Sequence, residues 1–331
     1  MSASNIIAIV GATGNQGSSV AHTFLSLPNW HVRCLTRNTS SPAALDLAAK
    51  GAEVVQADLT DKESLVRAFA GAHAIFVNTD FWAPYGAAVK AGKSREESTR
   101  IGFDVEFSHV KNATDAAATI PTLRRFIYSA LGPMKVASNG KYPHSGHWDS
   151  KAVAVDYIEA ETPELAAKTS FIYLGAYSTN PLLLPQKYPH LGDWALMLPA
   201  PAEMQMPVIR ERESTGPFVR ALIEDEEPGL KLLAYDAYPT MQEAADTWSK
   251  LTGHTAKVVQ VTLEEMQERT GLPYEVLDGP AFVGEFGFMH GVKGKVVEPR
   301  DLKTKVPTKT LEEIFEAKGI DQLLGSKHPD M

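Results

Sequence analysis

The fold is decided by the stretch Asn5-Ile-Ile-Ala-Ile-Val10-Gly11-Ala-Thr-Gly14-Asn-Gln-Gly17. Its apolar run, Ile6 to Val10, predicts a buried strand that leads directly into three glycines. The residues that follow have the apolar spacing of a helix. A glycine-rich turn between a strand and a helix is the context in which a loop binds a dinucleotide. The stretch therefore predicts the first strand-turn-helix unit of a nucleotide-binding fold.

Each glycine of this loop has its own predicted role. Gly11 permits the tight turn, Gly14 lets the backbone approach a pyrophosphate, and Gly17 lets the helix pack closely on the strand. The phosphates would lie at the helix N-terminus, where free N–H groups and the helix dipole favour anions. An ordinary glycine-rich turn is the alternative. The predicted cofactor-binding residues of the loop are Gly11, Thr13, Gly14, Asn15, Gln16 and Gly17.

The first 130 residues alternate between short runs rich in Val and Ile and longer segments with helical spacing. Such an alternation favours a parallel sheet, because parallel strands need a helix-length connection. We therefore expect an α/β protein with a doubly wound parallel-sheet Rossmann fold. The predicted strands are 5–10, 31–36, 53–56, 74–78, 125–129 and 169–174, and the predicted helices are 17–27, 41–50, 61–70 and 97–118.

The composition changes after Leu174, where six prolines between positions 181 and 207 interrupt regular structure. We expect residues 1–174 to form the dinucleotide-binding Rossmann domain and residues 175–331 a smaller, irregular α+β domain for a substrate or partner, with segments exchanged between the two. In the second domain we expect helices at 240–251 and 263–270, a strand at 256–261, and a last helix at 310–324 that is capped by Thr310.

Composition and charge exclude several classes of protein. The 331 residues are 44% hydrophobic and 22% charged, which argues against disorder. A net charge of -8 repels a polyphosphate backbone, so we expect no direct nucleic-acid binding. No run approaches the roughly 18 apolar residues of a membrane span, so no membrane association is expected. Cys34 has no second cysteine to pair with and no Cys/His cluster predicts a metal site, which fits a reducing interior.

The glycine spacing, G-x-x-G-x-x-G, resembles that of the short-chain dehydrogenase superfamily in its extended or atypical branch. At the end of the second predicted strand, where an NAD-binding protein places an acid, the chain has Arg37. A guanidinium can fork onto a 2′-phosphate and stack on adenine, so NADP(H) is the expected cofactor, with NAD(H) bound more weakly. A solvated surface arginine is the alternative.

The resemblance also implies contacts at the ends of the later strands. Asp58 matches the position that hydrogen-bonds the adenine amino group, and a loop or N-cap aspartate is the alternative. Asn78 and Thr79 follow the fourth predicted strand, where the chain passes the pyrophosphate and ribose, although both could equally form a turn. Ser129 lies where the superfamily often carries the Ser or Thr that polarises a substrate carbonyl, and it could equally be a cap.

The superfamily's catalytic pair is Tyr-x-x-x-Lys, a spacing that places both side chains on one helix face. Here the segment is His147-Trp-Asp-Ser-Lys151, so His147 replaces the tyrosine, and neither Tyr142 nor Tyr157 has the spacing to substitute for it. An imidazole can donate a proton near neutral pH, which makes His147 the expected general acid. A histidine that packs or caps the helix start is the alternative. Lys151 is expected to contact the nicotinamide ribose.

A glycine loop of this type, Arg37 and the His-x-x-x-Lys pair together resemble the NmrA-like family. Supporting stretches are Gly51-Ala-Glu-Val-Val-Gln-Ala-Asp58, Val155-Asp-Tyr-Ile158, Asn180-Pro-Leu-Leu183 and Glu243-Ala-Ala-Asp-Thr-Trp248, so the resemblance covers nearly the whole chain. It implies a Rossmann fold that binds NADP or NAD beside a smaller C-terminal domain. It also implies two kinds of function: redox sensors that bind a transcription factor or other regulatory protein in the cytoplasm or nucleus, and reductases of small organic molecules.

Two functions therefore stay open. The missing tyrosine favours a nucleotide-sensing regulator slightly over an NADPH-dependent oxidoreductase of a small carbonyl, imine or alcohol. Tyr177 and Asn180 are the expected residues of a substrate pocket. Other aromatic and methionine side chains could line it or form plain core: Trp194, Met197, Met204, Met206, Phe286, Phe288 and Met289. The substrate, the partner and the oligomeric state, a homodimer included, are left open.

Overall fold

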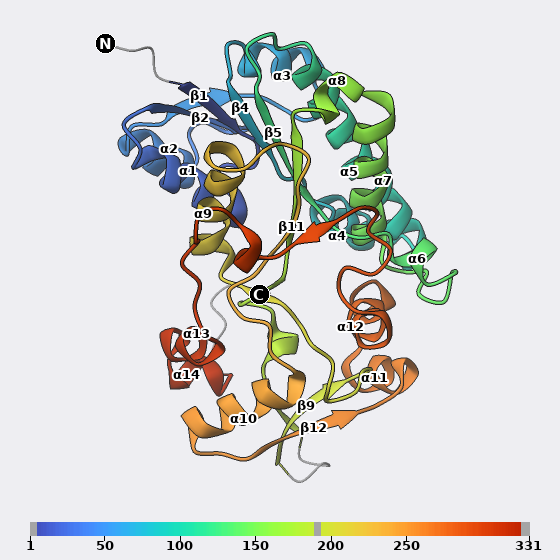
Figure 1. Cartoon of the computed structure of the whole chain (residues 1–331). Coiled ribbons are helices and arrows are strands. Elements are labelled where there is room, and N and C mark those ends of the chain that lie inside the picture. Colours follow the sequence, from blue (N-terminus) through green and yellow to red (C-terminus); the bar gives the residue numbers. More distant parts are fainter. Residues whose placement is uncertain (1–4, 189–192, 326–331) are drawn as a thin grey trace.

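The computed structural model describes residues 5–188 and 193–325. Helices cover a central sheet in the upper part of Figure 1, and a smaller group of helices and strands lies below it. The elements up to residue 174 are β1 (Asn5–Ile9), α1 (Asn15–Leu25), β2 (Trp30–Thr36), α2 (Pro42–Ala49), β3 (Glu53–Gln56), α3 (Lys62–Phe69), β4 (Ala74–Val77), α4 (Trp82–Lys90), α5 (Arg95–Ala118), β5 (Arg125–Ala130), α6 (Met134–Ala137), α7 (Gly146–Glu161), α8 (Pro163–Ala166) and β6 (Thr169–Leu174).

The later elements include several that the sequence did not predict, above all α9, β11 and α12. They are β7 (Ala176–Tyr177), η1 (Pro181–Leu183), β8 (Gln186–Tyr188), β9 (Asp193–Leu198), β10 (Val208–Ile209), α9 (Glu211–Glu224), β11 (Lys231–Ala234), α10 (Met241–Thr252), β12 (Ala256–Gln260), α11 (Leu263–Thr270), α12 (Tyr274–Phe286), β13 (Val296–Val297), η3 (Pro299–Asp301), α13 (Leu311–Lys318) and α14 (Ile320–Leu323).

The central sheet has eight parallel strands in the order β13-β11-β6-β5-β4-β1-β2-β3. All six strands predicted for this sheet are present, with ends shifted by at most one residue. The chain runs outward from β1 to β3 and then crosses back to β4 on the other side of β1. The expected doubly wound Rossmann fold is therefore confirmed. In such sheets the crevice at the carboxyl ends of β1 and β4, where the order reverses, is the place where ligands bind.

Alternate residues of the central strands face opposite sides of the sheet. On one side Ile7 and Ile9 of β1 belong to a core with Phe24 of α1 and Phe218 of α9. On the other side Ala8 belongs to a core that includes buried residues of α3, α5 and α7. Helices thus cover both faces. This two-sided burial explains why the strands appear in the sequence as continuous apolar runs.

Strands β11 and β13 come from the C-terminal half of the chain and extend the central sheet beyond β6. Helix α9, which precedes β11, packs against α1. The two helices approach so closely that a Cβ added to Gly216 would lie 2.2 Å from the backbone oxygen of Ser19. The domain division at residue 174 stays a prediction, but the sheet takes in segments from both sides of it.

The smaller C-terminal region has a mixed three-stranded sheet, in which β9 pairs in parallel with β12 and antiparallel with β8. Helices α10 and α11 and strand β12 lie where the sequence predicted them. The single helix expected over 310–324 is wrong, because Gly319, with φ of +78°, separates α13 from α14. Thr310 does cap α13, in a capping box with Glu313. None of the described helices combines the length and apolar character needed to cross a bilayer.

Candidate functional site

The glycine loop forms the turn between β1 and α1. Gly11 has φ of +72°, a conformation that favours glycine. Gly17 packs on the loop itself, since an added Cβ would lie 2.2 Å from the Gly11 oxygen. Gly14 is the N-cap of α1 and has no side chain to cover the first N–H groups of the helix. A Cβ added there would meet the Gly11 oxygen at 3.3 Å. The loop therefore has the form that binds a pyrophosphate at a helix N-terminus.

Residues at the ends of β4 and β6 flank this loop. A Cβ added to Gly11 would lie 3.3 Å from the Asn78 oxygen, so these two residues pack directly. Gln16 Nε2 donates a hydrogen bond to the Tyr177 hydroxyl at 2.6 Å. Burial raises the pKa of Tyr177 to about 12, so its hydroxyl stays protonated at neutral pH. Asn180 caps the short helix η1, where its Oδ1 accepts from the Leu182 N–H at 2.9 Å.

Arg37 and Asp58 follow β2 and β3. Asp58 Oδ1 accepts from the N–H and the hydroxyl of Thr60, each at 2.8 Å. These bonds, aided by the positive charge of Arg37, lower the pKa of Asp58. Asp58 thus has the role of a turn-forming loop aspartate, and its adenine contact stays a prediction. Arg37 is exposed near Asp58, and its contact with a 2′-phosphate stays a prediction.

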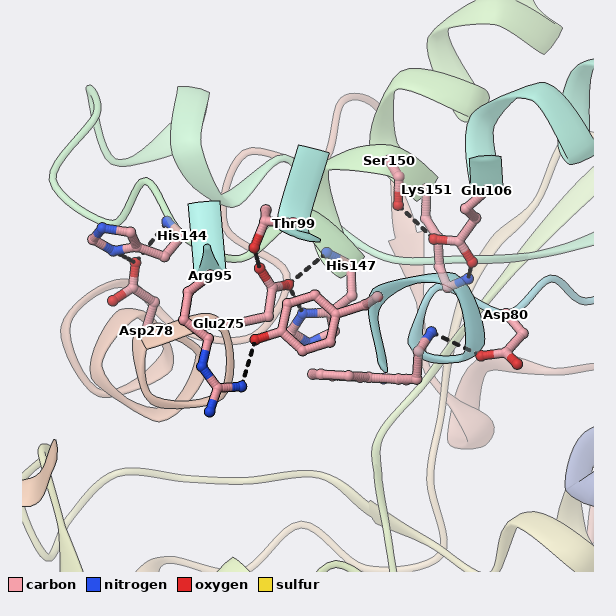
Figure 2. A network of polar contacts seen from close by, with 12 residues as sticks. Asp80, Arg95, Thr99, Glu106, His144, His147, Ser150, Lys151, Glu275 and Asp278 are labelled. Atoms are coloured by element: carbon pink, nitrogen blue, oxygen red, sulfur yellow. Dashed lines mark hydrogen bonds and ion pairs between the residues drawn. The ribbon is translucent and has the colours of Figure 1, made fainter. Parts of the chain in front are cut away.

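Lys151 belongs to a buried network at the carboxyl end of β4 (Figure 2). Its Nζ donates to Oε1 of Glu106. It also lies 3.3 Å from Oγ1 and 3.4 Å from O of Thr79. Thr79 donates to Oε1 of Glu106 at 2.8 Å, and Ser150 donates to Oε2 at 2.5 Å. Glu106 is fully buried, whereas the Lys151 side chain keeps 12% of its exposure. Thr79 and Lys151, both expected to contact the cofactor, are therefore in direct contact.

His147 lies one helical turn before Lys151 on α7 and is held by Glu275 of α12 (Figure 2). Its Nδ1 lies 2.7 Å from Glu275 Oε1, and its backbone N–H donates to the same oxygen at 2.9 Å. Thr99 of α5 donates to the other oxygen, Oε2, at 2.8 Å. An ionised carboxylate can only accept, so Nδ1 carries the hydrogen. Nε2 is then the nitrogen available to a bound molecule, on a side chain that is 17% exposed.

Aromatic side chains at the start of α4 lie against the His147 ring. The ring centroids of Phe81 and Trp82 lie 5.8 and 4.9 Å from that of His147. Phe81 is buried, but Trp82 keeps 43% of its exposure. The imidazole is therefore held between a buried carboxylate and an apolar wall, beside an indole that a bound molecule could contact.

A second histidine, His144, lies just before α7 and also pairs with a carboxylate of α12. His144 donates from its backbone N–H to Asp278 Oδ2 at 2.9 Å, and its Nδ1 lies 3.1 Å from that oxygen. His144 lines a cavity of about 940 Å³ along another face of α7, together with Asp149 and Val153. Neither His147 nor Lys151 lines this cavity. The two histidines, three residues apart, therefore lie in different surroundings.

Other residues considered from the sequence are buried or have partners elsewhere. Ser129 is buried within β5, opposite Ile172 of β6. The Tyr142 and Tyr157 hydroxyls donate to Glu285 and Asp115, respectively. Among the side chains proposed for an apolar pocket, several are core residues, as the alternative interpretation held: Met197, Met204, Met206 and Phe288. In residues 5–188 and 193–325 no group of three or more His, Cys, Asp and Glu side chains could hold a metal ion.

Sequence reasoning missed both buried carboxylates of the site. A signal for Glu106 does exist, because it follows Gly102 and precedes Val110 at four-residue spacing on the buried face of α5. An acid on an otherwise apolar helix face needs a buried partner. Glu275 shares the buried face of α12 with Asp278, but nothing local relates it to His147, 128 residues earlier.

Comparison with known proteins places the chain in a family. A family model described as the NmrA-like family matches residues 3–314. The chain is 49% identical over 136 residues to the NmrA-like family domain-containing oxidoreductase hkm9 of Aspergillus hancockii, a match that covers 41% of this chain and 36% of that relative. It is 37% identical over 136 residues to the oxidoreductase FrzB of Cladobotryum sp, covering 41% and 37%. The match thus spans little more than a third of the length of these relatives.

Solved structures share the fold over most of the chain. NmrA, a negative transcriptional regulator, has a TM-score of 0.66 at 18% identity and covers 98% of this chain and 92% of its own. The leucoanthocyanidin reductase of Vitis vinifera, solved with NADPH, has a TM-score of 0.67 at 16% identity and covers 95% and 99%. Identities this low show the shared fold alone. The family model, which matches nearly the whole chain, decides the relationship: the protein belongs to the NmrA-like family.

Proposed function

We propose that the protein is an NADP(H)-dependent oxidoreductase of a small organic carbonyl, imine or alcohol. The observation that carries this proposal is the contact between His147 and the buried carboxylate of Glu275. It orients an imidazole one helical turn from Lys151, at the position where the superfamily has its proton-donating tyrosine. The names of the fungal relatives, which call them oxidoreductases, support the same assignment.

The residues at the switch point fit a dinucleotide. Gly11, Gly14 and the N-terminus of α1 would hold the pyrophosphate, and a Cβ at Gly17 would clash with the backbone of this loop. Arg37 would take the 2′-phosphate, which favours NADP(H) over NAD(H). Asn78, Thr79 and Lys151 would adjoin the ribose. When bound, the nicotinamide supplies or takes up the hydride.

His147 would move the proton. In its protonated form both ring nitrogens carry hydrogen, and the negative charge of Glu275 stabilises this imidazolium. Nε2 then donates its proton to the substrate oxygen or nitrogen as the carbonyl or imine is reduced. In the reverse direction the neutral ring accepts the proton of the alcohol or amine at Nε2. Glu275 keeps Nδ1 protonated throughout, so the same nitrogen serves both directions.

Trp82 supports a substrate that is organic and at least partly apolar. Trp82 is 43% exposed, and the centroid of its indole lies 4.9 Å from that of the His147 ring. An apolar molecule that covers this indole would bury exposed surface beside Nε2, which is favourable in water. Catalysis and binding would then take place on the same side of α7.

The regulator favoured by the sequence makes different predictions, so turnover separates the two functions. We would measure NADPH consumption with a panel of aldehydes, ketones and cyclic imines, and NADP⁺ reduction with alcohols. His147→Ala should lower turnover roughly 10²- to 10⁴-fold with little change in NADPH affinity. His144→Ala is the matched control, since His144 has an equivalent carboxylate partner but lines a cavity that His147 does not reach.

NADPH binding without turnover across the panel, or turnover that His147→Ala leaves unchanged, would overturn the oxidoreductase proposal. The first result would favour the regulator. In that case a transcription factor or other regulatory protein becomes the expected partner, and NADP(H) should change the affinity for it by the same factor with which the partner changes NADP(H) affinity.

A further inference from the structure

Glu106 is the second buried carboxylate of the site, and the proton transfer described above does not use it. We propose that Glu106 is a positioning residue that keeps Lys151 charged and fixes its Nζ against Thr79 at the carboxyl end of β4. The inference rests on the proposed function for one point only, namely that Lys151 contacts the bound dinucleotide.

The contacts of Glu106, which lies on α5, come from two other parts of the chain. Oε1 accepts from Lys151 of α7 and from the Thr79 hydroxyl after β4, at 2.8 Å for the latter, and Oε2 accepts from Ser150 of α7 at 2.5 Å. Glu106 itself lies in the middle of α5 and is fully buried. One carboxylate therefore ties α5 and α7 to the segment that follows β4. A side chain with this many partners fixes the position of each of them.

The charges around Glu106 identify Lys151 as its counter-ion. His109, also on α5, interacts electrostatically with Glu106, but burial lowers the pKa of His109, so this imidazole is neutral at neutral pH. Burial raises the pKa of Tyr128 on β5 well above its usual value, so this phenol is neutral as well. The other charged groups near His109 are Asp58, which is half-buried, and Asp80 and Arg37, which are exposed. Lys151 is the cation in direct contact with the buried carboxylate.

The geometry also shows which contacts a ribose could replace. An ammonium has three hydrogens, and the acceptors of Lys151 are Glu106 Oε1 and the two oxygens of Thr79. The Thr79 contacts are long, at 3.3 and 3.4 Å, so they are weaker and can be exchanged for a hydroxyl at small cost. The contact with Glu106 would persist. Glu106 thus lets Lys151 offer a positioned, charged donor without adding net charge to the site.

The test replaces the carboxylate and follows the protonation of Lys151 through NADPH binding. Glu106→Gln keeps the shape but leaves a buried ammonium without its counter-charge, and burial favours the neutral amine. NADPH affinity would be titrated by fluorescence from about pH 6 to about pH 9. The ratio of the dissociation constants of variant and wild type should rise about tenfold or more over this range, because a neutral lysine loses a charge-assisted hydrogen bond.

Two further variants separate positioning from general structural support. Glu106→Asp retains the charge, so the ratio of its NADPH dissociation constant to that of the wild type should not change with pH, even if its affinity for NADPH is lower. Glu159→Gln is the matched control, because Glu159 pairs at 2.7 Å with another well-buried lysine, Lys231, on β11, away from β4 in the sheet. It should leave the pH dependence of NADPH binding unchanged. If Glu106→Gln weakens NADPH binding by the same factor at every pH, the proposal is wrong and Glu106 has only a structural role.

A second measurement needs neither the variant nor the cofactor. Trace acetylation of the wild-type protein with acetic anhydride, read by mass spectrometry, reports the neutral fraction of each lysine against pH. As the pH is raised, Lys151 should begin to react no earlier than the exposed Lys135 does. If Lys151 reacts as a neutral amine near pH 7, the proposal is wrong, whether or not Glu106→Gln folds. Failure of the wild type to bind NADPH would instead overturn the proposed function and leave this result standing.

Discussion

The Nδ1 atom of His147 on α7 lies 2.7 Å from Oε1 of Glu275 on α12, a residue 128 positions later in the chain. The histidine belongs to the helix that packs on the central sheet, whereas the glutamate comes from the C-terminal region. Thr99 of α5 donates to the second oxygen of the same carboxylate. Glu275 thus orients the imidazole from outside the nucleotide-binding fold, and the site is complete only when both parts of the chain are folded.

Loss of the Glu275 charge should therefore impair catalysis more than binding. Glu275→Gln keeps an oxygen that can accept from the His147 N–H but no longer stabilises the imidazolium. We expect turnover to fall by roughly 10- to 100-fold, which corresponds to the loss of one hydrogen bond to a charged group. The NADPH dissociation constant should change little. Steady-state kinetics would be compared with Asp278→Asn, which alters the equivalent partner of His144; equal losses in both variants would contradict a specific role for Glu275.

Arg37 should set the cofactor preference. Arg37→Ala is expected to weaken NADP⁺ binding by about 1.5 to 3 kcal/mol and to leave NAD⁺ binding nearly unchanged, because only NADP⁺ has the 2′-phosphate. Isothermal titration calorimetry with both cofactors measures this difference. Arg67→Ala, which removes the same charge from an exposed position on α3, is the control. Equal losses for the two cofactors would contradict a contact between Arg37 and the 2′-phosphate, and no loss for either would mean that Arg37 is a solvated surface arginine.

Substitutions of Gly14 and Gly17 should have different effects, one on dinucleotide binding and the other on stability. A Cβ at position 17 would lie 2.2 Å from the Gly11 oxygen and 2.8 Å from the Ala12 Cα, so Gly17→Ala should destabilise the folded protein. A Cβ at position 14 would meet only the Gly11 oxygen, at 3.3 Å. Gly14→Val should therefore fold and lose dinucleotide binding, since its side chain takes the space of the pyrophosphate. Thermal unfolding and NADPH titration distinguish the two; retained affinity in folded Gly14→Val would show that the loop is only a turn.

Asp149 should make stability depend on pH. Burial raises the pKa of Asp149 to about 6, against the opposing effect of the Lys135 N–H that bonds Oδ1. The folded protein holds this proton where the unfolded chain, with an aspartate pKa of about 4, has released it. The contribution of Asp149 to the free energy of unfolding therefore falls as pH rises from about 4 to about 6 and stays low above that range.

Asp149→Asn removes this loss and keeps an oxygen for the Lys135 N–H. The variant should exceed the wild type in stability at about pH 8 by an amount on the order of 1 to 3 kcal/mol, and the difference should vanish toward pH 4. Urea unfolding at several pH values measures it, with Asp104→Asn, at an exposed position on α5, as the control. A difference that does not vary with pH would refute the assignment.

The sequence by itself determined the nucleotide-binding fold. The strands β1 to β6 were predicted to within a residue at each end, because buried parallel strands appear as continuous apolar runs separated by helix-length connections. The glycine spacing and the residues at the strand ends, such as Arg37 and Thr79, could be placed for the same reason: in a parallel sheet the carboxyl ends of all strands meet at one edge. His147 and Lys151 could be paired because a separation of four residues is local to one helix face.

Tertiary structure alone decided what holds these side chains. Glu275 and Glu106 reach His147 and Lys151 from α12 and α5, and no spacing in the sequence relates helices that meet only after folding. The same holds for β11 and β13, short strands that follow the proline-rich segment and are recognisable as part of the main sheet only by their pairing beyond β6. Periodicity is a property of one element, whereas a buried ion pair depends on how two elements pack, and the energy that selects that packing comes from the whole core.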